Sequence, residues 1–148
     1  MNKLAMPQVI NILSLDVGDT RTGVATARSD VKLPSPHSFI TASGDSLLHK
    51  IAALVESEDS KAIVIGLPRG LDGQTTKQTE HIQEIIDKIT TMVTIPVFVQ
   101  DEALTSRKAE DELVARGKPY QKGDIDALAA TYILQDFLAD HPKVEDEI

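Results

Sequence analysis

The sequence predicts a single α/β domain built on one mixed sheet of five strands, with helices on both faces. The early part of the chain reads as short strands joined by turns, and the remainder alternates between strands and helical periodicity. The later strands are apolar without alternation, which is typical of strands covered on both faces. A length of 148 residues suits one domain with an ordinary core.

Five segments are predicted to be strands because they are short, apolar and bounded by turn residues. In chain order they are Ile10–Leu15, Thr22–Arg28, Ser38–Thr41, Lys61–Leu67 and Ile95–Gln100. The link between the first two is short and contains Gly18, which favours a β-hairpin. Leu33–Pro36 precedes the third strand, and we expect it to be irregular because its prolines cannot donate ladder hydrogen bonds.

Four segments repeat apolar residues at helical spacing. They are Leu47–Val55, Thr75–Thr91, Ser106–Arg116 and Ile125–Ala139. Asp45 or Ser46 can cap the first helix, Gly117 should end the third, and Asp124 is expected to cap the last. Residues 1–8 and 141–148 are expected to be flexible. The element order is therefore β-β-β-α-β-α-β-α-α, within one domain that covers residues 1–148.

Composition limits the classes of function. The chain has no cysteine, which excludes disulfides and thiolate metal sites and is compatible with a cytoplasmic protein. We find neither a signal peptide nor an apolar stretch long enough to span a membrane. The net charge of −8 argues against broad electrostatic attraction to nucleic acid. A carboxylate metal site would contribute to that charge, and bound cations would reverse its sign locally.

The first two candidate site residues are Asp16 and Asp126. Asp16 directly follows an apolar strand, where a buried carboxylate needs water, hydrogen bonds or a metal ion. Asp126 shares a helical face with Ala130, Ile133 and Phe137, so we expect it to point inward. If the last helix covers the sheet, Asp126 can meet Asp16.

A third carboxylate is expected from Asp101 or Glu102, which follow the last strand. Their side chains point to opposite sides, so only one can face Asp16, and the pattern of residues leaves the choice open. Gly66, at the end of the strand between, is expected to leave open space. Carboxylates that converge there would suit Mg²⁺ or Mn²⁺ and the hydrolysis of phosphodiester bonds.

Four sequence motifs resemble those of one family. They are DVGDTRTGVA, GLPRGLDG, DEALTSRKAE and KGDIDALAATYIL, in this order between about residues 10 and 138. Together they are similar to the YqgF-like (RuvX-type) family of bacterial proteins. That resemblance implies a ribonuclease H-like fold. It also implies a nuclease, described either as a Holliday junction resolvase or as an enzyme that matures the 5′ end of pre-16S ribosomal RNA.

The resemblance implies that Asp16, Glu102 and Asp126 form an acidic triad that binds Mg²⁺ or Mn²⁺. The family usually has arginine after the Asp-Glu pair, whereas this chain has Ala103. A replacement cation could come from nearby basic residues, and Arg21 could hold phosphate. The candidates for that replacement are Arg69, Arg107 and Lys122.

The expected partner is nucleic acid, either pre-rRNA or branched DNA, bound by a monomer or a homodimer without a membrane. One alternative is a catalytically weak RNA-binding factor for ribosome assembly, suggested by the −8 charge and Ala103. Another is an ATP-binding protein, because sugar kinases and actin-like ATPases share a similar opening hairpin. This chain is short for the two-lobed proteins of that second class.

Overall fold

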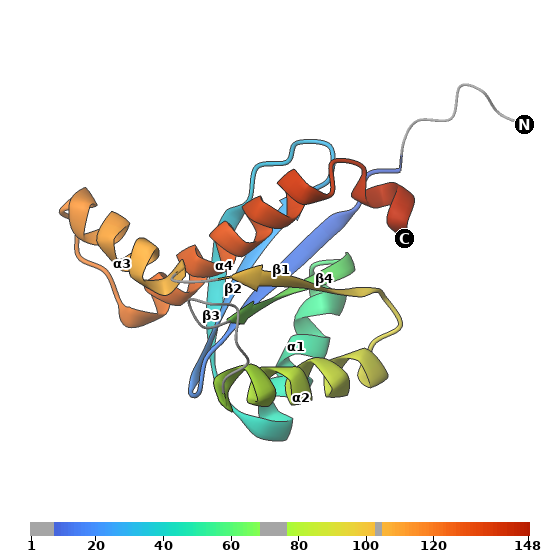
Figure 1. Cartoon of the computed structure of the whole chain (residues 1–148), viewed down its shortest axis with the longest axis horizontal. Coiled ribbons are helices and arrows are strands. Elements are labelled where there is room, and N and C mark those ends of the chain that lie inside the picture. The colour runs from blue at the N-terminus through green and yellow to red at the C-terminus, as the bar shows by residue number, and fades with distance from the viewer. Residues whose placement is uncertain (1–7, 69–76, 103–104) are drawn as a thin grey trace, which may run out of the picture.

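The computed structural model describes residues 8–68, 77–102 and 105–148, the last of these with side chains from residue 108 onward. Figure 1 shows a sheet with helices on both of its sides. The elements are β1 Asn11–Val17, β2 Arg21–Arg28, β3 Ser35–Thr41, α1 Gly44–Ser57, β4 Ser60–Pro68, α2 Lys77–Met92, β5 Val97–Glu102, α3 Thr105–Arg116, α4 Lys122–Asp140 and the 3₁₀-helix η1 Val144–Glu147.

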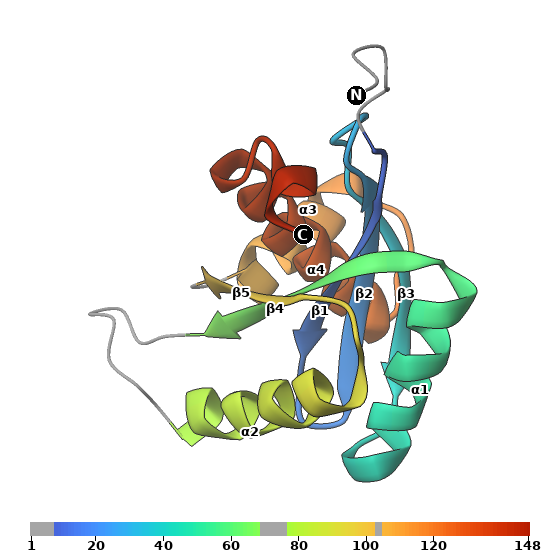
Figure 2. The same cartoon turned by 90° about the vertical axis from the view of Figure 1, so that its right-hand side faces the viewer.

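The five strands form one mixed sheet in the order β3-β2-β1-β4-β5. β1, β2 and β3 pair antiparallel, as a meander with short links requires. β4 and β5 run parallel to β1, because α1 and α2 each carry the chain back before the next strand. Figure 2 shows α1 and α2 on one face, with α4 behind the sheet. The predicted five-stranded sheet with helices on both faces is confirmed.

Each face of the central strands belongs to a different apolar layer. On β1, Leu13 and Leu15 pack into the layer under α1 and α2, while Ile12 packs into the layer under α4. β4 divides in the same way, with Ile63 toward the first layer and Val64 toward the second. Strands buried on both faces have no polar side, which explains the unbroken apolar runs of the sequence.

Three local expectations were wrong. β3 begins at Ser35 and includes Pro36, which is tolerated because β3 is an edge strand and its register with β2 shifts there. Asp124 is not the N-cap of α4: it is the third helical residue, and its carboxylate accepts a hydrogen bond from the backbone N–H of Gln121. Ser43, rather than Asp45 or Ser46, is the N-cap of α1.

The C-terminal tail, residues 141–148, contains η1 and packs against the apolar layer under α4. Val144 of η1 is completely buried in the α4 layer. The His141 ring stacks on Phe137 at a centroid distance of 4.2 Å and Nδ1 contacts Glu147. Burial of the apolar Val144 side chain stabilises the packing of the tail against the rest of the protein.

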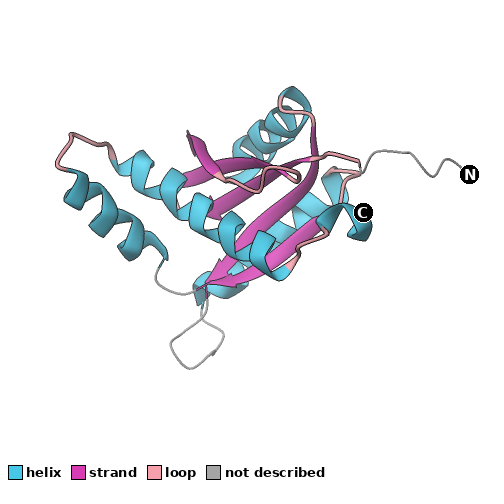
Figure 3. Ribbon diagram, turned by 90° about the horizontal axis from the view of Figure 1, so that it is seen from above, coloured by secondary structure: helices cyan, strands magenta, loops and turns pink. Residues whose placement is uncertain are grey.

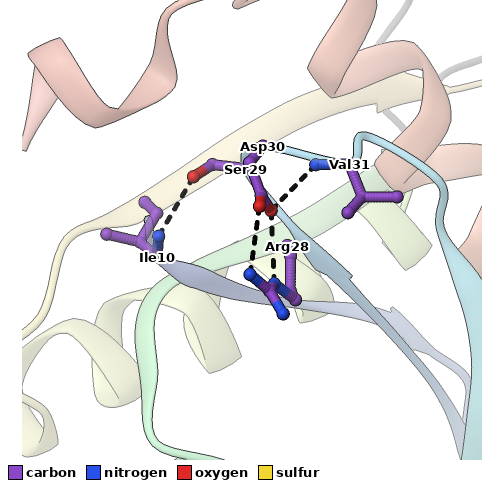
Figure 4. Close-up of polar contacts among 5 residues, drawn as sticks. All are labelled: Ile10, Arg28, Ser29, Asp30 and Val31. Carbon is purple, nitrogen blue, oxygen red and sulfur yellow. Dashed lines mark hydrogen bonds and ion pairs between the residues drawn. The ribbon is translucent and has the colours of Figure 1, made fainter. Parts of the chain in front are cut away.

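The turn after β2 closes the end of the sheet away from Asp16. The Ser29 hydroxyl accepts a hydrogen bond from the Ile10 backbone, and the Arg28 guanidinium donates two to Asp30 (Figure 4). Asp30 also accepts one from the Val31 backbone N–H. The bond between Ile10 and Ser29 ties the residue before β1 to the turn, and the other bonds lie within the turn itself. Among the described residues, no helix has the length and apolarity needed to cross a membrane.

Candidate active site

The alternation of side chains along β1 and β5 puts Asp16 and Glu102 on the face of the sheet that α4 covers. On β1, the Ser14 hydroxyl donates a 2.7 Å hydrogen bond to the Ala130 carbonyl of α4. On β5, Phe98 packs on Phe137 of α4 with ring centroids 5.1 Å apart. Asp16 lies two residues after Ser14 and Glu102 four after Phe98, so both side chains keep that face, while Asp101 points to the other.

The close approach of α4 to β2 brings Asp126 beside Asp16. Gly23 of β2 is the register partner of Asp16. A Cβ atom built on Gly23 would lie 1.9 Å from the backbone carbonyl oxygen of Asp126. Only glycine therefore lets the helix backbone lie directly on this strand. Gly23 was not singled out in the sequence, because its partner lies about a hundred residues away along the chain.

The environment of Asp16 disfavours its charged form. Burial of the carboxyl group is the main cause, and the negative charge of Asp126 adds to it. Together they raise the pKa of Asp16 from 3.8 to about 7. A carboxylate in this state gains free energy from any cation that approaches it.

Arg21 compensates part of the negative charge in this corner. Its Nε donates to Asp126 Oδ2 at 2.8 Å, and about a third of the arginine side chain is exposed. The residue predicted to hold phosphate therefore lies at the candidate site, in an ion pair with one of the candidate carboxylates. We call Asp16, Arg21 and Asp126 the β1 group.

A second acidic cluster surrounds Glu102 at the end of β5. Burial, followed by a hydrogen bond to Asp136 and its negative charge, raises the pKa of Glu102 from 4.5 to about 8. Lys108 of α3 acts in the opposite direction. A hydrogen bond between two carboxyl groups requires a proton on one of them. Glu102 Oε1 is buried and has no hydrogen-bond partner. We call Glu102, Lys108 and Asp136 the β5 group.

The β1 and β5 groups are separated. Gly66 was expected to leave an open gap between them, and that expectation was wrong: a Cβ atom there would lie 2.3 Å from Ile133 Cδ1. The side chain of Ile133 fills the space. Glu102 pairs with Pro68, so it lies two residues further along the sheet than Asp16. The strand spacing and the rise per residue put the Cα atoms of Asp16 and Glu102 roughly 12 Å apart.

Within the described residues, no three Asp, Glu or His side chains lie close enough to hold one metal ion together. Asp16 and Asp126 are brought together, whereas Glu102 lies on the same face but apart from them. Lys122 is exposed in the first turn of α4. Arg69, Ala103 and the side chain of Arg107 lie outside the described residues.

The donors present nevertheless fit a hard divalent cation. All are carboxylates, the ligand type that Mg²⁺ and Mn²⁺ prefer. Asp16 and Glu102 have raised pKa values, and Glu102 Oε1 is a buried acceptor without a donor. In each case a carboxyl group lacks a positively charged partner or a hydrogen-bond donor, and a bound cation would supply the missing positive charge.

Comparisons with known proteins identify the family of the chain. Residues 10–140 match the RuvX family, which is described as Holliday junction resolvase. A protein of Chloroflexus aurantiacus named "Putative pre-16S rRNA nuclease" is 38% identical over 130 residues, which cover 86% of this chain and 85% of the relative. Proteins with the same name from a Roseiflexus species and from Pseudomonas paraeruginosa are 37% and 31% identical, over 86% and 89% of this chain and 92% and 94% of theirs.

Solved structures of Thermus thermophilus RuvC have a similar fold. One is in complex with a Holliday junction substrate, and it superposes with a TM-score of 0.53 at 14% identity. A second RuvC structure superposes with a TM-score of 0.54 at 13% identity. Each comparison covers 88% of this chain and 96% of the other. The ribonuclease H-like fold is therefore confirmed.

Proposed function

Because the chain belongs to the RuvX family, we propose that it is a metal-dependent nuclease that hydrolyses phosphodiester bonds near the 5′ end of pre-16S ribosomal RNA. The observation that carries the proposal is the Asp16–Asp126 pair. It lies under the first turns of α4, at the end of the parallel strands where α/β sheets bind ligands. The names of the relatives supply the substrate, and the chemistry of the carboxylates supplies the reaction.

Asp16, Glu102 and Asp126 are the residues that would hold the metal. When bound, Mg²⁺ or Mn²⁺ supplies Lewis acidity for hydrolysis of the phosphodiester. Asp16 contributes a carboxylate already desolvated on the rigid strand β1. Asp126 is held by α4, and Arg21 beside it can orient a phosphate oxygen with the guanidinium nitrogens that do not contact Asp126.

Glu102 requires one further step in this proposal. It can join Asp16 and Asp126 only after its side chain leaves Asp136 and loses the shared proton. The complete site would therefore assemble when metal and substrate are present, around the fixed half formed by β1 and α4. Cations attract carboxylates and lower their pKa values, so binding itself favours this change.

The direct test is cleavage of an RNA fragment that spans the 5′ end of 16S rRNA and its leader, with Mg²⁺ present. We expect Asp16→Asn to reduce the rate constant by about 10²-fold or more, because a metal site contributes several kcal/mol to such reactions. Asp101→Asn is the matched control, since it removes an acid from the opposite face of the sheet. Equal rates for wild type and Asp16→Asn would overturn the proposal.

Resolution of branched DNA is the second candidate, favoured by the description of the matching family as Holliday junction resolvase. A synthetic four-way DNA junction, incubated under the same conditions, separates it from the first. Paired symmetric nicks in the junction with an intact RNA fragment would favour the resolvase. Binding of RNA without cleavage of either substrate would favour an assembly factor.

A further inference from the structure

A cavity lies beside the start of α4, between α3 and the edge strand β3. Its volume is about 290 Å³, and it lies between the end of α3, the α3–α4 loop, α4 and β3. Leu113, Pro36 and Ala127 give it apolar walls, and Tyr120, which also lines it, is 37% exposed. Arg116 and Lys118 add positive charge at its edge. Figure 3 shows the α3–α4 loop at this end of α4.

We propose that this cavity holds an unpaired nucleotide of the substrate strand. Its base would lie against the Tyr120 ring, and a neighbouring phosphate would lie beside Arg116 and Lys118. This inference rests on the proposed function, and it names the form of nucleic acid that the site accepts. An aromatic ring with adjacent cations is the arrangement by which proteins bind unpaired strands, because every base can stack and every phosphate is charged.

The distribution of charge supports the assignment. Residues 116–122 carry three cations and no acid, in a chain whose net charge is −8. Two nearby acids have partners: Asp124, which lines the cavity, keeps its charge and accepts a 2.8 Å hydrogen bond from the Gln121 backbone N–H. Glu112 forms an ion pair with Arg116 at 2.8 Å, which offsets the charge of both side chains. Lys118 has no ion-pair partner among the described residues. The exposed side chains of Lys118 and Lys122 are therefore the cations of this segment that can attract phosphate.

The position of the cavity relative to Asp126 gives it a role in selecting the substrate. Asp124 and Ala127 line the cavity, while Asp126 between them faces β2. The cavity and the candidate active site thus lie on two flanks of one helix, about 10 Å apart. A stacked strand covers this distance in roughly three nucleotides at about 3.4 Å each. A base paired within a duplex cannot enter the cavity, so the enzyme would require unpaired residues close to the scissile bond.

Tyrosine fluorescence tests the contact without any cleavage. The chain has two tyrosines and no tryptophan, so Tyr132→Phe leaves Tyr120 as the single strong emitter. Titration with a short unpaired oligoribonucleotide in EDTA should quench this emission. An oligomer of the same length with abasic sites has the same charge and should quench little, and a blunt RNA duplex should behave like the abasic oligomer. Equal quenching by the abasic oligomer, or no quenching by the unpaired one, would overturn the inference.

Variants give the second readout. Tyr120→Ala should weaken binding of the unpaired oligomer by about tenfold or more, as base–aromatic contacts usually do, and Tyr120→Phe should restore it. Lys118→Gln should reduce the salt dependence of binding, whereas Lys50→Gln, an exposed lysine on α1, should not. Unchanged affinity in Tyr120→Ala would overturn the inference even if the enzyme cleaves RNA. If the unpaired oligomer quenches the Tyr120 emission but the wild-type protein does not cleave RNA, the proposed function would be overturned instead.

Discussion

The β1 and β5 groups each contain a carboxyl group whose charged form is disfavoured by burial, and they offset its negative charge in different ways. Each places a carboxyl group with a raised pKa on the face covered by α4, at the end of a strand. In the β1 group, backbone contact at Gly23 fixes the positions and Arg21 offsets part of the charge. In the β5 group, a proton shared with Asp136 offsets the charge, and one oxygen of Glu102 has no partner. The positions of the first group are therefore fixed by the backbone, whereas those of the second depend on a shared proton.

The largest effect is expected where the backbone holds the β1 group together. Gly23→Ala puts a methyl group against the backbone of Asp126, where neither side can yield without moving α4. We expect it to lower the free energy of unfolding by about 3 kcal/mol, at the upper end for overpacked sites. Chemical denaturation measures this loss.

Gly66→Ala is the matched control for that substitution. Its Cβ atom would meet the end of the Ile133 side chain, which can rotate away, so we expect a cost of only about 1 kcal/mol. Equal losses in both variants would show that backbone contact at Gly23 does not distinguish the β1 group.

The second-largest effect is expected on metal binding, which substitutions in the two groups should change in different ways. Asp126→Asn removes a proposed ligand, and we expect the affinity for Mn²⁺ at pH 8 to fall by about 100-fold, or about 2.7 kcal/mol. Asp136→Asn removes the neighbour that raises the pKa of Glu102. The affinity of the Asp136→Asn variant for Mn²⁺ at pH 8 should change little. The pH at which Mn²⁺ binding is half-maximal should move downward, because Glu102 would ionise at a lower pH. Isothermal titration calorimetry across pH 6–9 measures both, and the same midpoint in wild type and Asp136→Asn would contradict the role given to Asp136.

The two groups also show which features of the fold and of the candidate site the sequence could predict. Patterns of apolar residues located the five strands and four α-helices of the described residues, because burial on two faces or one stripe imposes its period on apolar residues. The features of the site that the sequence did not predict are pairings set by tertiary packing. That α4 touches Gly23, that Ile133 fills the space at Gly66 and that Glu102 meets Asp136 all depend on where one helix crosses the sheet. No local pattern encodes that crossing.

The stability of the metal-free protein should depend on pH through the β1 group. The folded-state pKa of Asp16, about 7, lies above its ordinary value of 3.8, so the folded protein binds more protons between these limits. Stability should therefore fall as pH rises from about 4 to about 7 and level off above. The difference should be roughly 2 kcal/mol, about half of the full linkage value because the residue is partly exposed.

Comparison with Asp16→Asn isolates this contribution from other titrating groups. The variant cannot ionise at this position, so its loss of stability between pH 5 and pH 8 should be smaller. It should also be more stable than the wild type at pH 8 without metal, through relief of repulsion with Asp126. Urea denaturation at both pH values, with EDTA present, measures the two slopes. Parallel slopes would mean that Asp16 ionises normally in the folded protein.

The smallest effect is expected from Lys108, which links the β5 group to α3. Its Nζ lies 4.3 Å from the centre of the Tyr132 ring, and its charge lowers the pKa of Glu102. Lys108→Gln should cost roughly 0.5–1 kcal/mol through loss of the cation–π contact, and it should raise the pKa of Glu102 further. Mn²⁺ binding should then require a higher pH than in the wild type, opposite in sign to Asp136→Asn. Lys88→Gln on α2 is the control, because it removes the same charge on the other face of the sheet. Shifts of the same sign in Lys108→Gln and Asp136→Asn would contradict the proposal that their opposed charges control the β5 group.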